Sequence, residues 1–222
     1  MSEKRNWKHF ALELLLIIVG INLGLFVNNL NEQRKEAKLE RQLLSELKTC
    51  LEGDLEDVNI NIDIHSKCAY STSKLLTYIQ TKEPIDSLAF HFNHTAGWSF
   101  FTKNTSTYES LKSIGFSIIK NDELRQKITE LYNVYYRSND EFENRFHDLN
   151  SKWQDILIAN IKGEWWNKED KVIDEKLAKI DNVEYYVSSI SGSHLGAKNY
   201  YSKRLKPKIT KLITLIDNEL GE

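Results

Sequence analysis

The sequence predicts an all-α protein in which an N-terminal transmembrane helix continues into a long stalk helix. We expect the stalk to pack with a second long, antiparallel helix and with shorter helices as a helical bundle. Residues 10–30 are almost entirely apolar, and apolar side chains then recur every three or four residues along two long segments. The 222 residues include only two prolines and nine glycines, which argues against a loop-rich or all-β design.

Residues 10–30 read FALELLLIIVGINLGLFVNNL and are interpreted as the membrane anchor. A helix over this range is about 31 Å long, enough to cross a hydrocarbon core of about 30 Å. One alternative is a cleaved signal peptide, but no small-residue cleavage site follows the apolar core. A second alternative is a buried helix of a soluble core, which would be unusually long and apolar all round. We therefore expect a transmembrane helix.

Polar and small residues inside the anchor suggest that it contacts another helix. Glu13 and Asn22 are intramembrane polar residues, and such side chains face the interface, the helix's own backbone or a neighbouring helix. Gly20, Gly24 and Asn28 follow one another at intervals of four on one helix face. Small residues allow two backbones to approach closely, so this face predicts self-association within the membrane.

The basic residues that flank the anchor do not by themselves determine its orientation in the membrane. Three basic residues lie in the short tail 1–9, and four lie between residues 34 and 41, so the two flanks nearly balance. A short basic tail is easily retained in the cytoplasm, and a long domain is translocated largely regardless of its charges. We expect a single-pass protein of the bacterial inner membrane with its N-terminus inside and most of the chain in the periplasm.

Residues 31–222 are expected to form one helical bundle domain. The stalk helix should cover about 31–82 and end before Glu83-Pro84. Its apolar stripe becomes polar in the middle, at His65 and Thr72. The stripe comprises Leu43, Leu47, Leu51, Leu55, Val58, Ile62, His65, Ala69, Thr72, Leu76 and Ile79.

After the stalk, the pattern predicts an aromatic loop over 84–105 and a short helix from Ser106 to Ile114. Ser106 and Glu109 have the spacing of a capping box. A second long helix is expected over about 121–162, with Asn121 as its N-cap, a short helix over 169–180, and a C-terminal helix over about 195–220 that Pro207 starts or kinks. Cys50 and Cys68 lie about 27 Å apart on a continuous helix, too far for an intrachain disulfide. They are interpreted as unpaired, the alternative being an interchain disulfide in a parallel oligomer.

Two segments of the chain resemble a known family. Residues 7–35 contain I-x-V-G-I-N-L-G-L and, at the exit of the anchor, N-N-L-N-E-Q-R-K; residues 107–125 read TYESLKSIGFSIIKNDELR. These blocks resemble an uncharacterised family of Bacteroidota single-span membrane proteins, although they cover less than a quarter of the chain. Leu30 and Ile114 depart from the residues common in that family. The resemblance implies the architecture and no activity.

Catalytic and cofactor motifs are not recognisable. His91 and His94 lack the further ligands that a zinc site requires, and packing or solvent contact is the preferred interpretation. The pair Glu143 and His147 is interpreted as an exposed contact one helical turn apart. No nucleophile elbow, Walker loop or dinucleotide fingerprint occurs. We therefore expect a protein that is not an enzyme and has no metal or cofactor.

Two groups of residues are candidate partner surfaces. Tryptophan at the surface often marks a contact. The basic run near the C-terminus is interpreted as a solvated helix face, the alternative being a surface for an anionic membrane or for an acidic neighbouring helix. The net charge of −2 calls for neither an acidic nor a basic partner, and nucleic acid is not expected. The candidate residues are Trp98, Trp165, Trp166, Lys203, Arg204 and Lys206.

Three functional hypotheses remain. The first is a non-enzymatic membrane-anchored scaffold or interaction protein that self-associates as a homo-oligomer in the lipid bilayer and binds partners, an envelope protein being a candidate. The second is an extracytoplasmic ligand-sensing bundle, suggested by the aromatic loop and by His65 and Thr72. The third, a small pore or transport subunit, would use Glu13 and Asn22.

Overall fold

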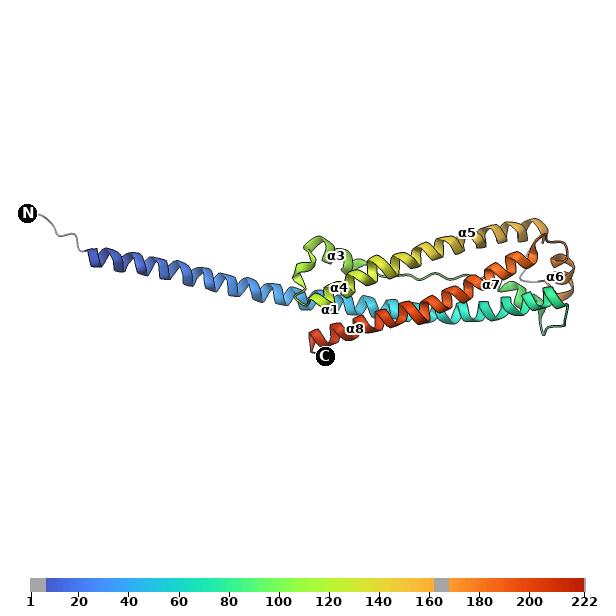
Figure 1. The fold of residues 1–222 in the computed structure, drawn as a ribbon, viewed down its shortest axis with the longest axis horizontal. Coiled ribbons are helices and arrows are strands. Elements are labelled where there is room, and N and C mark those ends of the chain that lie inside the picture. The colour runs from blue at the N-terminus through green and yellow to red at the C-terminus, as the bar shows by residue number, and fades with distance from the viewer. Residues whose placement is uncertain (1–6, 162–167, 222) are drawn as a thin grey trace, which may run out of the picture.

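A single helix, α1 (Trp7–Thr81), forms the axis of the molecule. The computed structural model describes residues 7–161 and 168–221. With 75 residues, α1 is about 110 Å long, and Figure 1 shows its N-terminal part projecting alone before the remainder enters the bundle. The helix ends where Lys82 adopts a left-handed backbone (φ 60°), two residues before Pro84. It is long and apolar enough at its N-terminal end to cross a membrane.

Two further long helical runs complete the bundle. α4 (Asp122–Glu130), the π-helical segment η2 (Leu131–Tyr136) and α5 (Arg137–Asn160) form one run. α7 (Val183–Tyr200), the π-helical segment η4 (Tyr201–Leu205) and α8 (Lys206–Leu220) form the other. The prediction of an all-α bundle around a long N-terminal helix is confirmed, since the described residues contain no strand.

The shorter helices close the two ends of the bundle. α3 (Ser106–Ile114) and the 3₁₀ turn η1 (Phe116–Ile118) lie at the end from which α1 projects, and α2 (Leu88–Asn93) and α6 (Asp170–Leu177) lie at the far end (Figure 1). Residues 84–105 thus contain a helix in addition to irregular chain. The C-terminal helix begins at Val183, well before the expected residue 195, because the glycines at 192 and 196 do not interrupt it.

The direction of the second long helix differs from the expectation. It runs parallel to α1: Asp54 bonds Tyr136 and, further along both helices, His65 packs on Phe146. The antiparallel neighbour of α1 is the C-terminal run, which pairs Gln80 with Glu184 at one end. The segment that connects α2 to α3, residues 97–105, is extended and returns along the length of the bundle; we call it the strap (Figure 1). Because of this return, the second run can start at the same end of the bundle as α1 and run parallel to it.

Local capping explains where the second run starts. The Asn121 side chain accepts a hydrogen bond from the Leu124 N–H at 3.2 Å, as the sequence predicts for an N-cap. The capping box at Ser106 and Glu109 does not form. Ser106 is already within α3, and its hydroxyl donates to the Asn104 side chain instead.

The core consists of two apolar clusters. The cluster nearer the projecting part of α1 gathers side chains such as Leu47, Leu111 and Leu212, and the far cluster gathers Leu75, Trp153 and Ile190. Between them α1 places Asn61 and His65, both about 1% exposed, at the positions that face the interior. The bundle therefore contains a buried polar layer between two apolar cores.

Candidate functional site

The polar layer lies on a heptad pattern of buried residues along α1. Nine buried positions follow alternating steps of three and four: Leu47, Leu51, Asp54, Val58, Asn61, His65, Cys68, Thr72 and Leu75. Leu43, Leu44 and Ser71 are buried beside this series. This spacing is that of a coiled-coil seam, but three of its positions in the middle carry Asp, Asn and His. The predicted stripe assigned Leu55, Ile62 and Ala69 to the interior instead, and these are only partly buried.

The strap explains the polar residues of α1. An extended segment without a neighbouring strand leaves its backbone groups unpaired, and buried unpaired groups are costly. Asp54 accepts the Asn104 N–H at 2.7 Å and Asp57 accepts the Thr102 N–H at 2.9 Å. Three more hydrogen bonds serve the strap carbonyls: Asn61 Nδ2 to Phe100 O, His65 Nε2 to Ser99 O, and the Tyr132 hydroxyl to Asn104 O.

The register of these contacts follows from geometry. From Asp54 to His65 the helix rises about 16 Å, and from Asn104 to Ser99 an extended chain covers about the same distance. One side of α1 can therefore hold successive residues of the strap. The side chains of α1 take the role that a neighbouring strand would have in a sheet.

Asp54 is the most strongly perturbed acid in this network. Its side chain is buried, and desolvation raises the pKa of its carboxyl group to about 6, even though hydrogen bonds from Tyr136 and Asn104 oppose the shift. The Tyr136 hydroxyl donates to Asp54 Oδ2 at 2.5 Å, and burial raises the pKa of this tyrosine strongly. This hydroxyl is thus a fixed donor.

A pair of buried histidines joins α1 to α7. His65 Nδ1 and His194 Nδ1 are 2.9 Å apart. Because the Ser99 carbonyl can only accept, His65 carries its proton on Nε2, and its bare Nδ1 accepts the proton of His194 Nδ1. His194 Nε2 is then a bare acceptor and finds no partner among the described residues. Burial lowers the pKa of both rings, that of His194 to about 3, so the pair is neutral.

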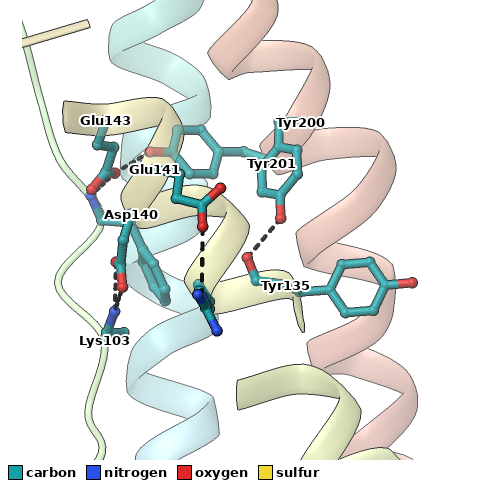
Figure 2. A network of polar contacts seen from close by, with 9 residues as sticks. Lys103, Tyr135, Asp140, Glu141, Glu143, Tyr200 and Tyr201 are labelled. Carbon is teal, nitrogen blue, oxygen red and sulfur yellow. Dashed lines mark hydrogen bonds and ion pairs between the residues drawn. The ribbon is translucent and has the colours of Figure 1, made fainter. Parts of the chain in front are cut away.

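α5 completes the layer from the other side, and Figure 2 shows this network. Glu143 Oε1 accepts the Phe101 N–H of the strap at 2.8 Å and the Tyr201 hydroxyl at 2.6 Å. Lys103 of the strap forms an ion pair with Asp140. The interpretation of Glu143 and His147 as an exposed pair is therefore wrong for Glu143, which binds the strap and η4.

The two π-helical segments meet beside this network. A π-helical turn displaces a backbone carbonyl from the usual hydrogen-bond ladder. The Tyr135 carbonyl of η2 accepts the hydroxyl of Tyr200, the residue before η4, at 2.7 Å (Figure 2). The widened turn of η4 ends two residues before Pro207, which lacks an N–H and would clash with a regular preceding turn.

An open pocket adjoins the outer side of the strap. Its volume is about 380 Å³, and its lining residues are Trp98, Phe100, Glu143, Asn144 and His147. The Trp98 and His147 rings stack at 4.8 Å with an interplanar angle of 21°. Phe100 stands nearly perpendicular to Trp98, at 81° and 4.4 Å between ring centroids. The predicted surface residue Trp98 therefore lines a pocket.

The other predicted site residues lie apart from this layer. Glu13, Gly20, Asn22, Gly24 and Asn28 are all on the exposed part of α1. Asn22 donates to the backbone carbonyl of Ile18 at 2.7 Å, and Asn28 donates to Glu32 at 3.2 Å. The structure brings Gly20, Gly24 and Asn28 to one open face, where no atom lies within 4 Å of a Cβ built on either glycine.

The basic candidates are exposed on the C-terminal run. Lys203 and Arg204 lie in η4, and Lys206 donates to Asn59 of α1 at 2.8 Å. Trp165 and Trp166 lie outside the described residues. Among the described residues, no group of three or more His, Cys, Asp and Glu side chains is placed to hold a metal ion. His91 bonds Asp86 at 3.0 Å and His94 bonds the Phe90 carbonyl.

Sequence reasoning did not single out His194 or Asp54. His194 is flanked by serine and leucine and follows no motif, so its pairing with His65 could only be found in three dimensions. One feature of the sequence could have identified Asp54: it continues the heptad spacing of Leu47, Leu51 and Val58, which predicts that its side chain is buried.

Comparison with known proteins identifies a family for the chain but no activity. The model of a family of unknown function, DUF6090, matches residues 13–158, which include α1 from within its apolar part, the strap and nearly all of α5. No curated protein and no solved structure matches the chain.

Proposed function

Because the chain belongs to the DUF6090 family, a family of unknown function, we propose its role from its geometry. We propose that it is a non-enzymatic, membrane-anchored helical scaffold that acts through self-association and partner binding. The lipid bilayer and a second copy of the chain are its first partners. An envelope protein is the proposed further partner of the bundle.

The exposed apolar part of α1 carries this proposal. Large apolar side chains between Phe10 and Val27 are about half exposed, for example Leu15 at 58% and Leu25 at 57%. Since no part of the described bundle reaches them, something outside the chain must cover them. A bilayer fits the length and the uniform apolarity of this segment.

The same helix supports coupling between membrane and bundle. α1 contains no break between its exposed apolar part and the seam that holds both cores and the strap. An association between two anchors would therefore bring two stalks side by side and fix the distance between two bundles. This arrangement suits a scaffold better than a soluble carrier.

Self-association is tested by filling the open face of the anchor. We expect Gly20→Leu with Gly24→Leu to shift the full chain in mild detergent toward the monomer mass, because bulky side chains prevent close backbone approach. Ile18→Leu with Phe26→Leu is the matched control on the opposite side of the helix and should leave the mass unchanged. An unaltered oligomer mass in the glycine variant, or a monomeric wild-type chain, would refute the proposed contact.

The placement of the protein is also part of the proposal. We propose a single-pass protein of the bacterial inner membrane with the N-terminus inside and the bundle in the periplasm. The resemblance of the segment around Asn28–Glu32 to Bacteroidota single-span proteins supports a bacterial membrane. A reporter active only outside the cytoplasm, fused after residue 222, should be active. Activity of a cytoplasm-specific reporter at that position would reverse the orientation.

A further inference from the structure

The pocket between the strap and α5 has the features of a site for an organic cation. Trp98 and Phe100, both from the strap, present aromatic rings at 81° to each other, and His147 supports Trp98 from α5 by stacking. Cations bind to the faces of aromatic rings, most strongly to that of tryptophan. Trp98 is 39% exposed, so part of its surface is accessible from solvent.

Glu143 adds a negative charge to the pocket wall. Its Oε1 accepts hydrogen bonds from the Phe101 N–H and the Tyr201 hydroxyl, which fix the carboxylate in place. No basic side chain in the part of the chain that the structure describes forms an ion pair with it; the nearby Lys103 is paired with Asp140. A partly buried carboxylate without a counter-ion favours a cation beside it.

The size of the pocket restricts the ligand. Its volume of about 380 Å³ is at the small end of the range typical of small-molecule pockets. A compact cation with an apolar surface fits both the volume and the aromatic walls. A metal ion fits less well, because the Trp98 and Phe100 rings contribute no donor atoms, and among the described residues no group of three or more His, Cys, Asp and Glu side chains is placed to hold one.

We propose that Trp98, Phe100 and Glu143 form a binding site for a small quaternary or alkylated ammonium compound, with the cation over the Trp98 and Phe100 rings and beside the Glu143 carboxylate. Because Phe101 and Glu143 belong to the contacts that hold the strap, occupancy of the pocket also stabilises the strap against α5. The site is independent of the self-association of the anchor.

The ligand is a free molecule and not a headgroup of the surrounding bilayer. Phe100 is bonded to Asn61, and about 45 Å of helix separates Asn61 from Leu30 at the end of the apolar segment. A lipid headgroup in the host membrane does not reach this height. The same ammonium chemistry carried by a lipid is tested as a separate source below.

The test uses the full chain in maltoside micelles, titrated with choline by calorimetry. The neutral isostere 3,3-dimethyl-1-butanol has the same shape without the charge. We expect choline to bind with a Kd of about 1 mM or tighter, and the isostere at least about tenfold more weakly. Equal affinity for the two compounds, or no heat of binding with choline, would overturn the proposal.

Two variants locate the site. Glu143→Gln keeps an oxygen for Phe101 and Tyr201 and should weaken choline binding about tenfold while leaving the isostere unaffected. Trp98→Leu should weaken both ligands, whereas Phe90→Leu, an exposed aromatic of α2 outside the pocket, should weaken neither. Unchanged choline affinity in Glu143→Gln, with wild-type thermal unfolding, contradicts the assignment even if Trp98→Leu fails to fold.

A final comparison separates the two sources of the ligand. The chain is placed in nanodiscs of phosphatidylglycerol or of phosphatidylcholine and titrated with choline. Equal affinities are expected, because the headgroups lie far below the pocket. A choline affinity reduced only in phosphatidylcholine would overturn the assignment of a free ligand and identify the headgroup as the occupant.

Discussion

Asp54, Asn61 and His65 occupy seam positions of α1 that a helical bundle usually gives to leucine or isoleucine. Each of them forms a hydrogen bond with the backbone of the strap: Asp54 accepts one from an N–H group, while Asn61 and His65 donate to carbonyls. Replacing any of them with an apolar residue would remove the partner of a partly buried backbone group of the strap. At the scale of single residues, the polar layer therefore determines where the strap lies.

Asp54 gives the layer a specific dependence on pH. Its folded-state pKa of about 6 lies above the value of 3.8 expected in the unfolded chain, mainly because of desolvation. The folded state then binds the proton more tightly, so the favourable contribution is complete below about pH 4 and is lost as pH rises through about 6. His65 and His194 change the stability in the opposite direction with pH, since their lowered pKa values favour the folded state above about pH 6.5.

The variant Asp54→Asn isolates this contribution. The amide can still accept the Asn104 N–H and donate to the Tyr136 oxygen, and it does not titrate. We expect the free energy of unfolding of the variant to increase relative to wild type as pH rises from about 4 to about 7, measured by urea denaturation. A difference between the two proteins that is constant across this range would show that Asp54 titrates normally.

At the scale of elements, the long helices could be predicted, although α2 was missed and the start of the C-terminal run was placed too late. The connection between α1 and the second run could not be predicted. Long apolar periodicity and scarce proline indicate helices wherever they occur, and Asn121 marks the start of the second run correctly. The strap has no period of its own, because side chains of α1 and α5 satisfy its backbone. Without that information an antiparallel second helix was the natural expectation, and it was wrong.

In the candidate sites too, some residues could be predicted from the sequence and others could not. Trp98 was recognisable as an aromatic residue in an irregular segment, but its neighbours His147 and Glu143 come from a helix more than forty positions away. The polar interruption at His65 was visible, whereas its partner His194 was not. Spacing within one helix can be read from sequence, while a site assembled by the strap from separate elements depends on tertiary packing.

At the scale of the whole molecule, one helix joins an exposed apolar segment to the bundle. The exposed apolar part of α1 and the seam of the bundle belong to the same unbroken helix, and the C-terminal run packs back toward the point where α1 leaves the bundle (Figure 1). Arg41 of α1 donates to the carbonyl of Leu220 there at 3.0 Å. The bundle is thus closed at its base, and the exposed apolar part of α1 projects beyond it (Figure 1).

The central claim is that this anchor lies in a membrane and pairs through the face of Gly20, Gly24 and Asn28. The most direct measurement is disulfide cross-linking in native membranes, with single cysteines placed in turn over residues 16–28 after replacement of Cys50 and Cys68 by serine and alanine. Cross-linked dimers should peak at 20, 24 and 28 and fall between them with a period of about 3.6 residues. Uniform cross-linking, a maximum on the face of Ile18 and Phe26, or a chain absent from the membrane fraction would contradict the account.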